Sequence, residues 1–224
     1  MAPWATLEFC KALYGQCRAE KDWHFPRVLL DINTKIPSRG RHLELDEINP
    51  SKFIAQTIKE LAGQGATVAV VACNTAHILY EQWSKHAPIP VLHIIEETIH
   101  FALDSGAMKV APLVSSSLSR ADLYGKQADA LGVACYRLKP ELQEIVSSLI
   151  ETIKTSGSIQ DQAALDTLWL RLKAMNVDTV VAGCTELSIL EPSCLSAGMR
   201  FVDSNYALAR AALRRIDVSP LHRA

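Results

Sequence analysis

The stretch Ala66-Thr-Val-Ala-Val-Val-Ala-Cys-Asn-Thr-Ala-His77 joins a continuous apolar run to a cysteine and then to a segment of helical character. A short uninterrupted apolar run is typical of a strand that is covered on both faces of a parallel sheet. Val181-Ala-Gly-Cys-Thr-Glu-Leu187 repeats the order of apolar run, cysteine and threonine. The two stretches form a weak internal repeat, which predicts two similar α/β halves.

Outside the repeat, apolar runs alternate with segments of helical periodicity, which indicates an α/β protein with mainly parallel sheets flanked by helices. Strands are expected at 27–33, 66–72, 89–95, 109–114, 134–138, 179–182 and 200–203. Helices are expected at 3–17, 50–63, 74–86, 96–104, 122–131, 140–155, 158–175 and 205–216, with a loop at 34–49. Pro112 weakens the strand at 109–114, because proline cannot donate a ladder hydrogen bond.

The boundary between the halves is expected near residues 96–106, where a strand and a helix precede a second run of alternating elements. The final helix is expected to return and cover the first half. The predicted first domain therefore comprises residues 1–98 and 205–224, and the predicted second domain comprises residues 99–204.

The composition excludes several classes of function. The chain has 224 residues, 49% of them hydrophobic, and a net charge of −1, so no basic excess points to nucleic acid or to an anionic membrane. No apolar run reaches the length of a membrane span, and the N-terminus lacks the basic start of a signal peptide. We therefore expect a cytoplasmic protein with reduced thiols. Six cysteines without a Cys-x-x-Cys pair make a metal site improbable.

Cys73 and Cys184 are expected to lie where a ligand binds, because ligands of open α/β sheets bind outside the carboxyl ends of the strands. A thiol directly before a helix lies near unpaired N–H groups, so its pKa is expected to fall toward neutrality. Asn74, Thr75 and Thr185 can donate hydrogen bonds to a carboxylate at the same helix ends. The alternative is that both cysteines only pack as small apolar residues.

Two opposed thiols of similar pKa suit racemisation. One thiolate removes the α-proton of an amino acid, and the opposite thiol delivers a proton to the other face. Donors aimed at the developing enediolate must supply much of the stabilisation.

The motifs Cys73-Asn-Thr-Ala-His77 and Gly183-Cys-Thr-Glu186 resemble the paired motifs of the aspartate/glutamate racemase superfamily. Their His and Glu endings are most like those of aspartate racemase. The resemblance extends over nearly the whole chain, and includes Pro3-x-Ala-Thr6, the stretch 33–39, Ile95-Glu-Glu-Thr98 and Val202-Asp203.

The resemblance implies racemisation of an acidic amino acid, most of all aspartate, in an active site between two similar domains. It also implies no cofactor, a homodimer, and a cationic clamp for the second carboxylate of the substrate. Arg39 matches the arginine of the family's clamp, and Lys154 falls in the region of its substrate lysine. Ser116 is the best aligned of three serines that can bind the α-carboxylate.

Two departures from the family pattern leave other functions open. The leading strand of the first domain is expected to be missing, and Pro112 stands in a stretch that is usually free of proline. A catalytically impaired relative that binds a dicarboxylate or serves in assembly is therefore the alternative. A third possibility is a hydrolase that uses Cys73 and His77.

Overall fold

The two sheets of the described residues are parallel, as the alternation of strands and helices predicts. The computed structural model describes residues 3–218. The chain divides into two compact units, each with its own sheet and its own core. The first unit joins Met1–Ile94 to Asn205–Ala224, and the second comprises Ile95–Ser204.

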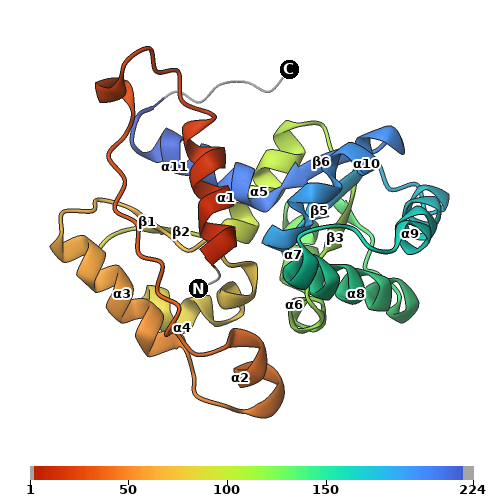
Figure 1. Ribbon diagram of the computed structural model, residues 1–224, viewed down its shortest axis with the longest axis horizontal. Helices are drawn as coiled ribbons and strands as arrows, with labels where there is room; N and C mark the ends of the chain where they lie inside the picture. Colours follow the sequence, from red (N-terminus) through yellow and green to blue (C-terminus); the bar gives the residue numbers. More distant parts are fainter. Residues whose placement is uncertain (1–2, 219–224) are drawn as a thin grey trace. The chain divides into compact units, whose positions relative to one another are not determined.

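The helices and strands follow one another as Figure 1 shows, with three 3₁₀ helices denoted η. In the chain order of the first unit they are α1 (Pro3–Tyr14), η1 (Asp22–His24), α2 (Arg39–Leu45), α3 (Ser51–Gly63), β1 (Ala69–Val70), η2 (Asn74–Leu79), α4 (Tyr80–Ser84) and β2 (Val91–Leu92). They continue as α5 (Ile94–Asp104), β3 (Lys109–Leu113), α6 (Ser116–Ala121), α7 (Leu123–Ala130), β4 (Ala134–Cys135), α8 (Pro140–Ser156), α9 (Gln162–Ala174), β5 (Thr179–Ala182), η3 (Thr185–Leu190), α10 (Glu191–Ser196), β6 (Arg200–Asp203) and α11 (Ser204–Arg215).

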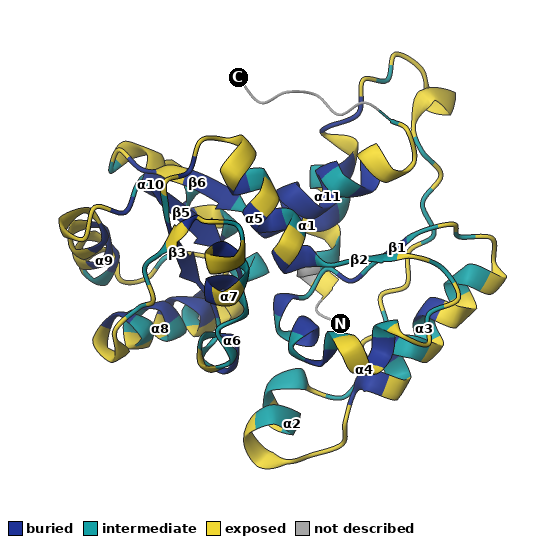
Figure 2. Ribbon diagram, turned by 180° about the vertical axis from the view of Figure 1, so that it is seen from behind, coloured by how far each residue is buried: buried dark blue, intermediate teal, exposed yellow. Residues whose placement is uncertain are grey.

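The second unit is built on a sheet with the strand order β4-β3-β5-β6. Its register places Leu113 beside Ala182 and Ala182 beside Asp203, so three strands end at one edge. Helix α8 has its buried residues at helical spacing, and α9 adds the buried Trp169 to the same core. Figure 2 shows buried residues on β3, β5 and β6 and on one side of α8 and α9.

The first unit has a smaller sheet, in which β1 pairs with β2 only. Ile54 and Ile58 of α3 are buried against this sheet. Trp83 of α4 is fully buried, and its indole N–H donates to the carbonyl of Ala76 at 3.0 Å. This hydrogen bond links α4 to η2, the segment that follows the first motif cysteine.

Pro112 lies within β3, an inner strand, and pairs with Val181 in register. Its nitrogen faces β4 rather than β5, because Tyr136 N–H donates to the Val110 carbonyl on that side at 2.8 Å. The next donor of the ladder would be residue 112, which has no N–H. The expected strand 134–138 therefore ends at Cys135, and Pro112 is tolerated because no ladder continues beside it.

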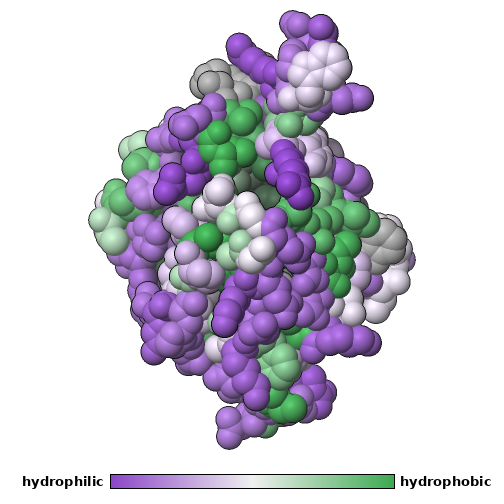
Figure 3. Space-filling view, turned by 90° about the vertical axis from the view of Figure 1, so that its left-hand side faces the viewer, coloured by the Kyte–Doolittle hydropathy of each residue, from purple (hydrophilic) through white to green (hydrophobic). Residues whose placement is uncertain are grey.

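The prediction of a buried strand at 27–33 is wrong. Leu30 and Ile32 are 46% and 37% exposed, and among the described residues no backbone hydrogen bond involves 27–32. An extended segment becomes a strand only where a neighbouring strand pairs with it, and here none does. Figure 3 shows patches of apolar surface among the polar surface on one side of the molecule.

Other predicted boundaries shift for local reasons. The expected loop 34–49 contains α2, because Ser38 caps its first turn by accepting a hydrogen bond from Arg41 N–H. The predicted strands 66–72 and 89–95 pair over two residues each, and the predicted helix 74–86 begins as 3₁₀. Within the described residues, no helix is long and apolar enough to cross a membrane.

Candidate functional site

The two motif cysteines occupy matching local structures in the two units. Each lies just after a parallel strand, has extended dihedral angles and stands at the N-cap of a six-residue 3₁₀ helix. In both units an α-helix follows directly, and its first residue, Tyr80 or Glu191, has φ −51° and ψ −51°. The internal repeat in the sequence therefore corresponds to a repeated strand-cysteine-helix structure.

Cys184 is held by a carboxylate from its own motif. Its thiol donates to Glu186 Oε2 at 2.9 Å, and Thr185 Oγ1 donates to the same oxygen at 3.1 Å. Glu186 is the acceptor in both contacts, so the carboxylate stabilises the protonated form of the thiol. The Thr185 hydroxyl proton, expected to serve a substrate carboxylate, is directed to Glu186 in this structure.

The expectation of a lowered thiol pKa is wrong for Cys184. Burial raises the pKa of Cys184 well above its ordinary value, and the charge and hydrogen bond of Glu186 raise it further. The positive charge of Lys154 acts in the opposite direction but is outweighed. The dipole of a short 3₁₀ helix stabilises a thiolate less than that of a long α-helix does. Desolvation by burial therefore determines the direction of the pKa shift.

Two further predicted residues lie in the same unit as Cys184. Lys154 is exposed in the last turn of α8, a helix that contacts η3, and its charge reaches the thiol. Ser116 begins α6 just after β3, and its Oγ is 3.0 Å from Ser147 Oγ. Because Ser147 donates its proton to the Gln143 carbonyl, Ser116 is the donor of this pair. The unit thus brings Ser116, Lys154 and Cys184 to the carboxyl edge of its sheet and to the helix beside it.

Tyr124 is a neighbour of Cys184 that the sequence does not reveal. Its side chain is buried, burial raises its pKa, and it hydrogen-bonds Thr98 and Ser204. A Cβ added at Gly183 would lie 2.8 Å from the Tyr124 ring and 2.5 Å from Val114 Cγ1. Only glycine fits between β5 and Cys184, which explains the glycine of the motif physically.

Cys73 is half-buried against the core of the first unit. His77 Nδ1 lies 2.9 Å from the Cys73 carbonyl oxygen. Burial, together with the neighbouring His93, lowers the pKa of His77 to about 3, so the ring is neutral and its Nδ1–H donates to that carbonyl. His77 positions the backbone at Cys73, and its Nδ1 is not available to take a proton from the thiol. Its Nε2, the remaining basic nitrogen, has no hydrogen-bond partner among the described residues, so the structure shows no Cys73–His77 side-chain pair of the kind that a Cys/His hydrolase uses.

Asn74 and Thr75 follow Cys73 in the first turn of η2, Asn74 buried and Thr75 half-buried. Arg39 begins α2, a helix that contacts η2. Its Nη1 donates to the Pro37 carbonyl at 3.3 Å, and its buried Nε has no hydrogen-bond partner among the described residues. The first unit therefore brings a guanidinium with an uncommitted donor to the helix that follows Cys73.

Each unit thus gathers one thiol and donors or cations that suit a carboxylate. Arg39, Asn74 and Thr75 accompany Cys73, while Ser116, Lys154 and Thr185 accompany Cys184. Within residues 3–218, no cluster of three or more His, Cys, Asp or Glu side chains could hold a metal ion. A thiol beside donors that suit a carboxylate is a group suited to proton transfer at sulfur.

A family model described as Asp/Glu/Hydantoin racemase matches residues 1–212. The chain is 26% identical over 213 residues to the broad specificity amino-acid racemase RacX of Bacillus subtilis (strain 168), covering 93% of this chain and 88% of that protein. It is 26% identical over 171 residues to the glutamate racemase of Streptococcus suis (strain 05ZYH33), covering 71% of this chain and 61% of that protein. The solved Picrophilus torridus aspartate racemase has a TM-score of 0.84 at 24% identity, with 98% of this chain and 92% of that chain covered, and this likeness shows the fold.

Proposed function

The chain belongs to the Asp/Glu/hydantoin racemase family, and from this premise we propose that it interconverts the enantiomers of aspartate with Cys73 and Cys184 as the two bases. The observation that carries this proposal is the repeated placement of the two thiols, each after a parallel strand and before a 3₁₀ helix. The reaction needs a proton acceptor on one face of the α-carbon and a proton donor on the other, and no cofactor is proposed.

One thiol and one thiolate must be present together for a turnover. The thiolate takes the α-proton, the C–H electron pair moves into the enediolate, and the opposite thiol returns a proton to carbon. Glu186 accepts the Cys184 S–H hydrogen bond at 2.9 Å, which favours Cys184 as the proton donor of the resting enzyme. Cys73 then starts as the base, and the roles reverse for the other enantiomer.

Arg39 and Lys154 are proposed to hold the side-chain carboxylate of the substrate, while Asn74, Thr75, Thr185 and Ser116 are proposed to hold the α-carboxylate. For this, the hydroxyls of Thr185 and Ser116 turn from Glu186 and Ser147 toward the substrate. A bidentate guanidinium suits a carboxylate, and a lysine adds a point charge. The Glu ending of the motif Gly183-Cys-Thr-Glu186 resembles that of aspartate racemases, and this resemblance favours aspartate as the substrate. Glutamate differs by one methylene, so it is tested beside aspartate.

The test is proton exchange in deuterium oxide. We expect deuterium to enter the α-position of L-aspartate and D-aspartate, with loss of optical rotation, and slower exchange with glutamate and alanine. The family includes a broad specificity racemase, so equal rates for alanine and aspartate would contradict the acidic substrate. Absence of exchange with all three amino acids would contradict racemisation.

A dicarboxylate-binding protein without turnover is the second candidate. The observation that favours it is the raised pKa of Cys184, which makes its thiolate scarce. Calorimetry that detects aspartate binding, combined with no deuterium exchange, would support this candidate over the racemase.

Glu186→Gln is expected to move the alkaline limb of the pH profile of kcat/KM to lower pH. The carboxylate raises the pKa of Cys184, so its removal lowers that pKa, and the second proton of the thiol pair is lost at lower pH. The profile is measured by polarimetry with aspartate. Glu151→Gln is the control, because Glu151 is exposed on α8. An unshifted limb in Glu186→Gln would contradict the role of Glu186 as the group that keeps Cys184 protonated.

A further inference from the structure

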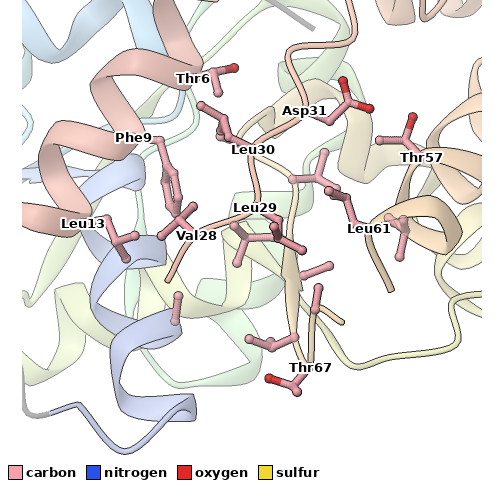
Figure 4. A pocket seen from close by; sticks show the side chains of 18 of the residues that line it. Thr6, Phe9, Leu13, Val28, Leu29, Leu30, Asp31, Thr57, Leu61 and Thr67 are labelled. Carbon is pink, nitrogen blue, oxygen red and sulfur yellow. The ribbon is translucent and has the colours of Figure 1, made fainter. Parts of the chain in front are cut away.

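Two pockets of the first unit differ in character. One is an apolar cavity of about 290 Å³, and Figure 4 shows Phe9, Leu29 and Leu61 among the side chains that line it. The other is a more open pocket of about 670 Å³, which is lined by residues of α3, of the segment before α3 and of the region of α4. We propose that this second pocket binds a small organic bisphosphate.

Two lysines and a histidine are the basic groups of this pocket. Lys52 and Lys59 belong to α3, and His86 follows α4, which packs against α3 as Figure 1 shows. Seven residues bring an α-helix back to nearly the same face, so both lysines leave α3 on one side, about 10.5 Å apart along the helix axis. The ammonium of Lys52 lies 5.2 Å from the centroid of the Phe53 ring, a contact that leaves its N–H donors free. Basic groups from two parts of the chain therefore meet at one pocket.

No carboxylate balances these three basic groups. The residues that line the pocket include no Asp or Glu, and none of the three side chains forms an ion pair or a hydrogen bond with another described residue. Carboxylates are not scarce in this chain, which has 24 Asp and Glu for 23 Lys and Arg. Exposed cations elsewhere have carboxylate partners, as in the pairs of Lys11 with Glu8 and of Arg41 with Glu47. The uncompensated positive charge of the pocket therefore favours an anionic ligand.

The amide of Gln82 adds two donors in a fixed orientation. Ser51 N–H, which can only donate, binds Asn49 Oδ1 at 2.9 Å, so Nδ2 is the Asn49 group that faces Gln82. Gln82 Oε1 accepts from Asn49 Nδ2 at 2.9 Å and from Ser51 Oγ at 3.1 Å, which uses both of its lone pairs. The Nε2 group of Gln82 has no partner among the described residues, so both of its N–H donors remain for a ligand in the pocket.

This set of donors suits a phosphate better than a carboxylate. A carboxylate carries a single charge in a plane, and it is matched by the planar fork of an arginine, which the lining of the pocket lacks. A phosphate group carries up to two charges on three terminal oxygens, and lysines bind it as point charges. The amide and the imidazole of the pocket can donate to further oxygens of the same group. The chemistry of the lining therefore selects phosphate among the small anions.

The spacing of the donors indicates two phosphates in one ligand. Ser51 holds the amide of Gln82 beside Lys52, and together they form the first phosphate position. Lys59 lies two helical turns further along α3 and forms the second position. Ala55 lies between the two lysines and lines the pocket, so its small side chain leaves room for the carbon body of the ligand.

The size and place of the pocket agree with this assignment. A volume of about 670 Å³ lies within the range of small-molecule sites and exceeds what inorganic phosphate fills. None of the residues proposed to bind aspartate lines this pocket, so the site is separate from that of the proposed reaction. Its test therefore requires binding measurements and no turnover.

The experiment measures binding to the full chain by calorimetry at low ionic strength, where the attraction between charges is least screened. Fructose 1,6-bisphosphate is the probe. Fructose 6-phosphate tests the need for the second phosphate, and citrate tests whether any polyanion is sufficient. Lys52→Gln and Lys59→Gln each remove one charge from the pocket. Lys85→Gln is the matched control, because Lys85 is exposed at the end of α4 and does not line the pocket.

We expect one bisphosphate to bind per chain, about tenfold or more tightly than fructose 6-phosphate or citrate. Lys52→Gln and Lys59→Gln are each expected to raise the dissociation constant about tenfold, because one charge-assisted hydrogen bond is lost. Lys85→Gln is expected to leave the dissociation constant within about twofold of that of the unchanged chain. Absence of saturable bisphosphate binding would overturn the proposal, as would equally tight binding of citrate or an equal loss in Lys85→Gln. Equally tight binding of fructose 6-phosphate would overturn the assignment of two phosphate positions.

Discussion

Cys73→Ser and Cys184→Ser are each expected to lower kcat for aspartate racemisation by about a thousandfold or more. A serine hydroxyl at either position has a pKa far above that of a thiol, so it neither removes the α-proton nor supplies a matched donor. Because each turnover needs both thiol groups, either substitution alone is sufficient to cause this loss of kcat. The rate is measured by polarimetry and by deuterium entry at the α-carbon.

Cys135→Ser is the matched control for the two cysteine variants. Cys135 is half-buried at the end of β4, and its pKa is raised to about 11, chiefly by burial. We expect this variant to keep its activity and its unfolding midpoint close to those of the unchanged chain. If both Cys73→Ser and Cys184→Ser kept substantial turnover, the two-thiol mechanism would be rejected.

Arg39→Leu is expected to lower kcat/KM for aspartate by about 10- to 100-fold, which corresponds to the loss of one or two charge-assisted hydrogen bonds. The buried Nε of Arg39 has no partner among the described residues, so one donor is free for a carboxylate. Arg39→Lys keeps the charge but loses the planar fork, and an intermediate loss is expected. Alanine has no side-chain carboxylate, so its slower turnover should be changed far less.

Arg41→Leu is the control for position 39. Arg41 lies on the same short helix, is exposed, and forms an ion pair with Glu47. Removal of an exposed ion pair costs little stability, and we expect no effect on aspartate turnover. A loss in Arg41→Leu equal to that in Arg39→Leu would mean that the effect arises from α2 as a whole rather than from a substrate clamp.

Much of the fold can be predicted from periodicity, because apolar runs covered by helices on both faces have a distinct pattern. The strands at 109–113, 179–182 and 200–203 and the helices α3, α8 and α9 agree with that pattern. The segment 27–33 has the same apolar composition but no pairing strand, and pairing is a tertiary property that composition does not encode. The length of β4 likewise depends on Pro112 in a different strand.

The placement of Cys73 and Cys184 after strands can be predicted from their motifs, whereas their electrostatic environments cannot. The sign of the pKa shift at Cys184 depends on burial and on the rotamer of Glu186, which turns back toward the sulfur. The only signal for Glu186 in the sequence is its position two residues after the cysteine of the motif Gly-Cys-Thr-Glu. Tyr124 is distant in sequence from both motifs, so nothing in the chain order indicates its position beside Gly183.

Pro112 has a consequence for how this sheet meets other molecules. The strand β4 stands at one edge of its sheet, and Pro112 limits it to two residues. An extended segment of another protein that approached this edge would find few backbone groups in register for pairing. Directly behind these groups lies Pro112, which has no N–H. Short edge strands of this kind resist edge-to-edge aggregation, so a residue that weakens the expected strand also protects the folded protein against self-association.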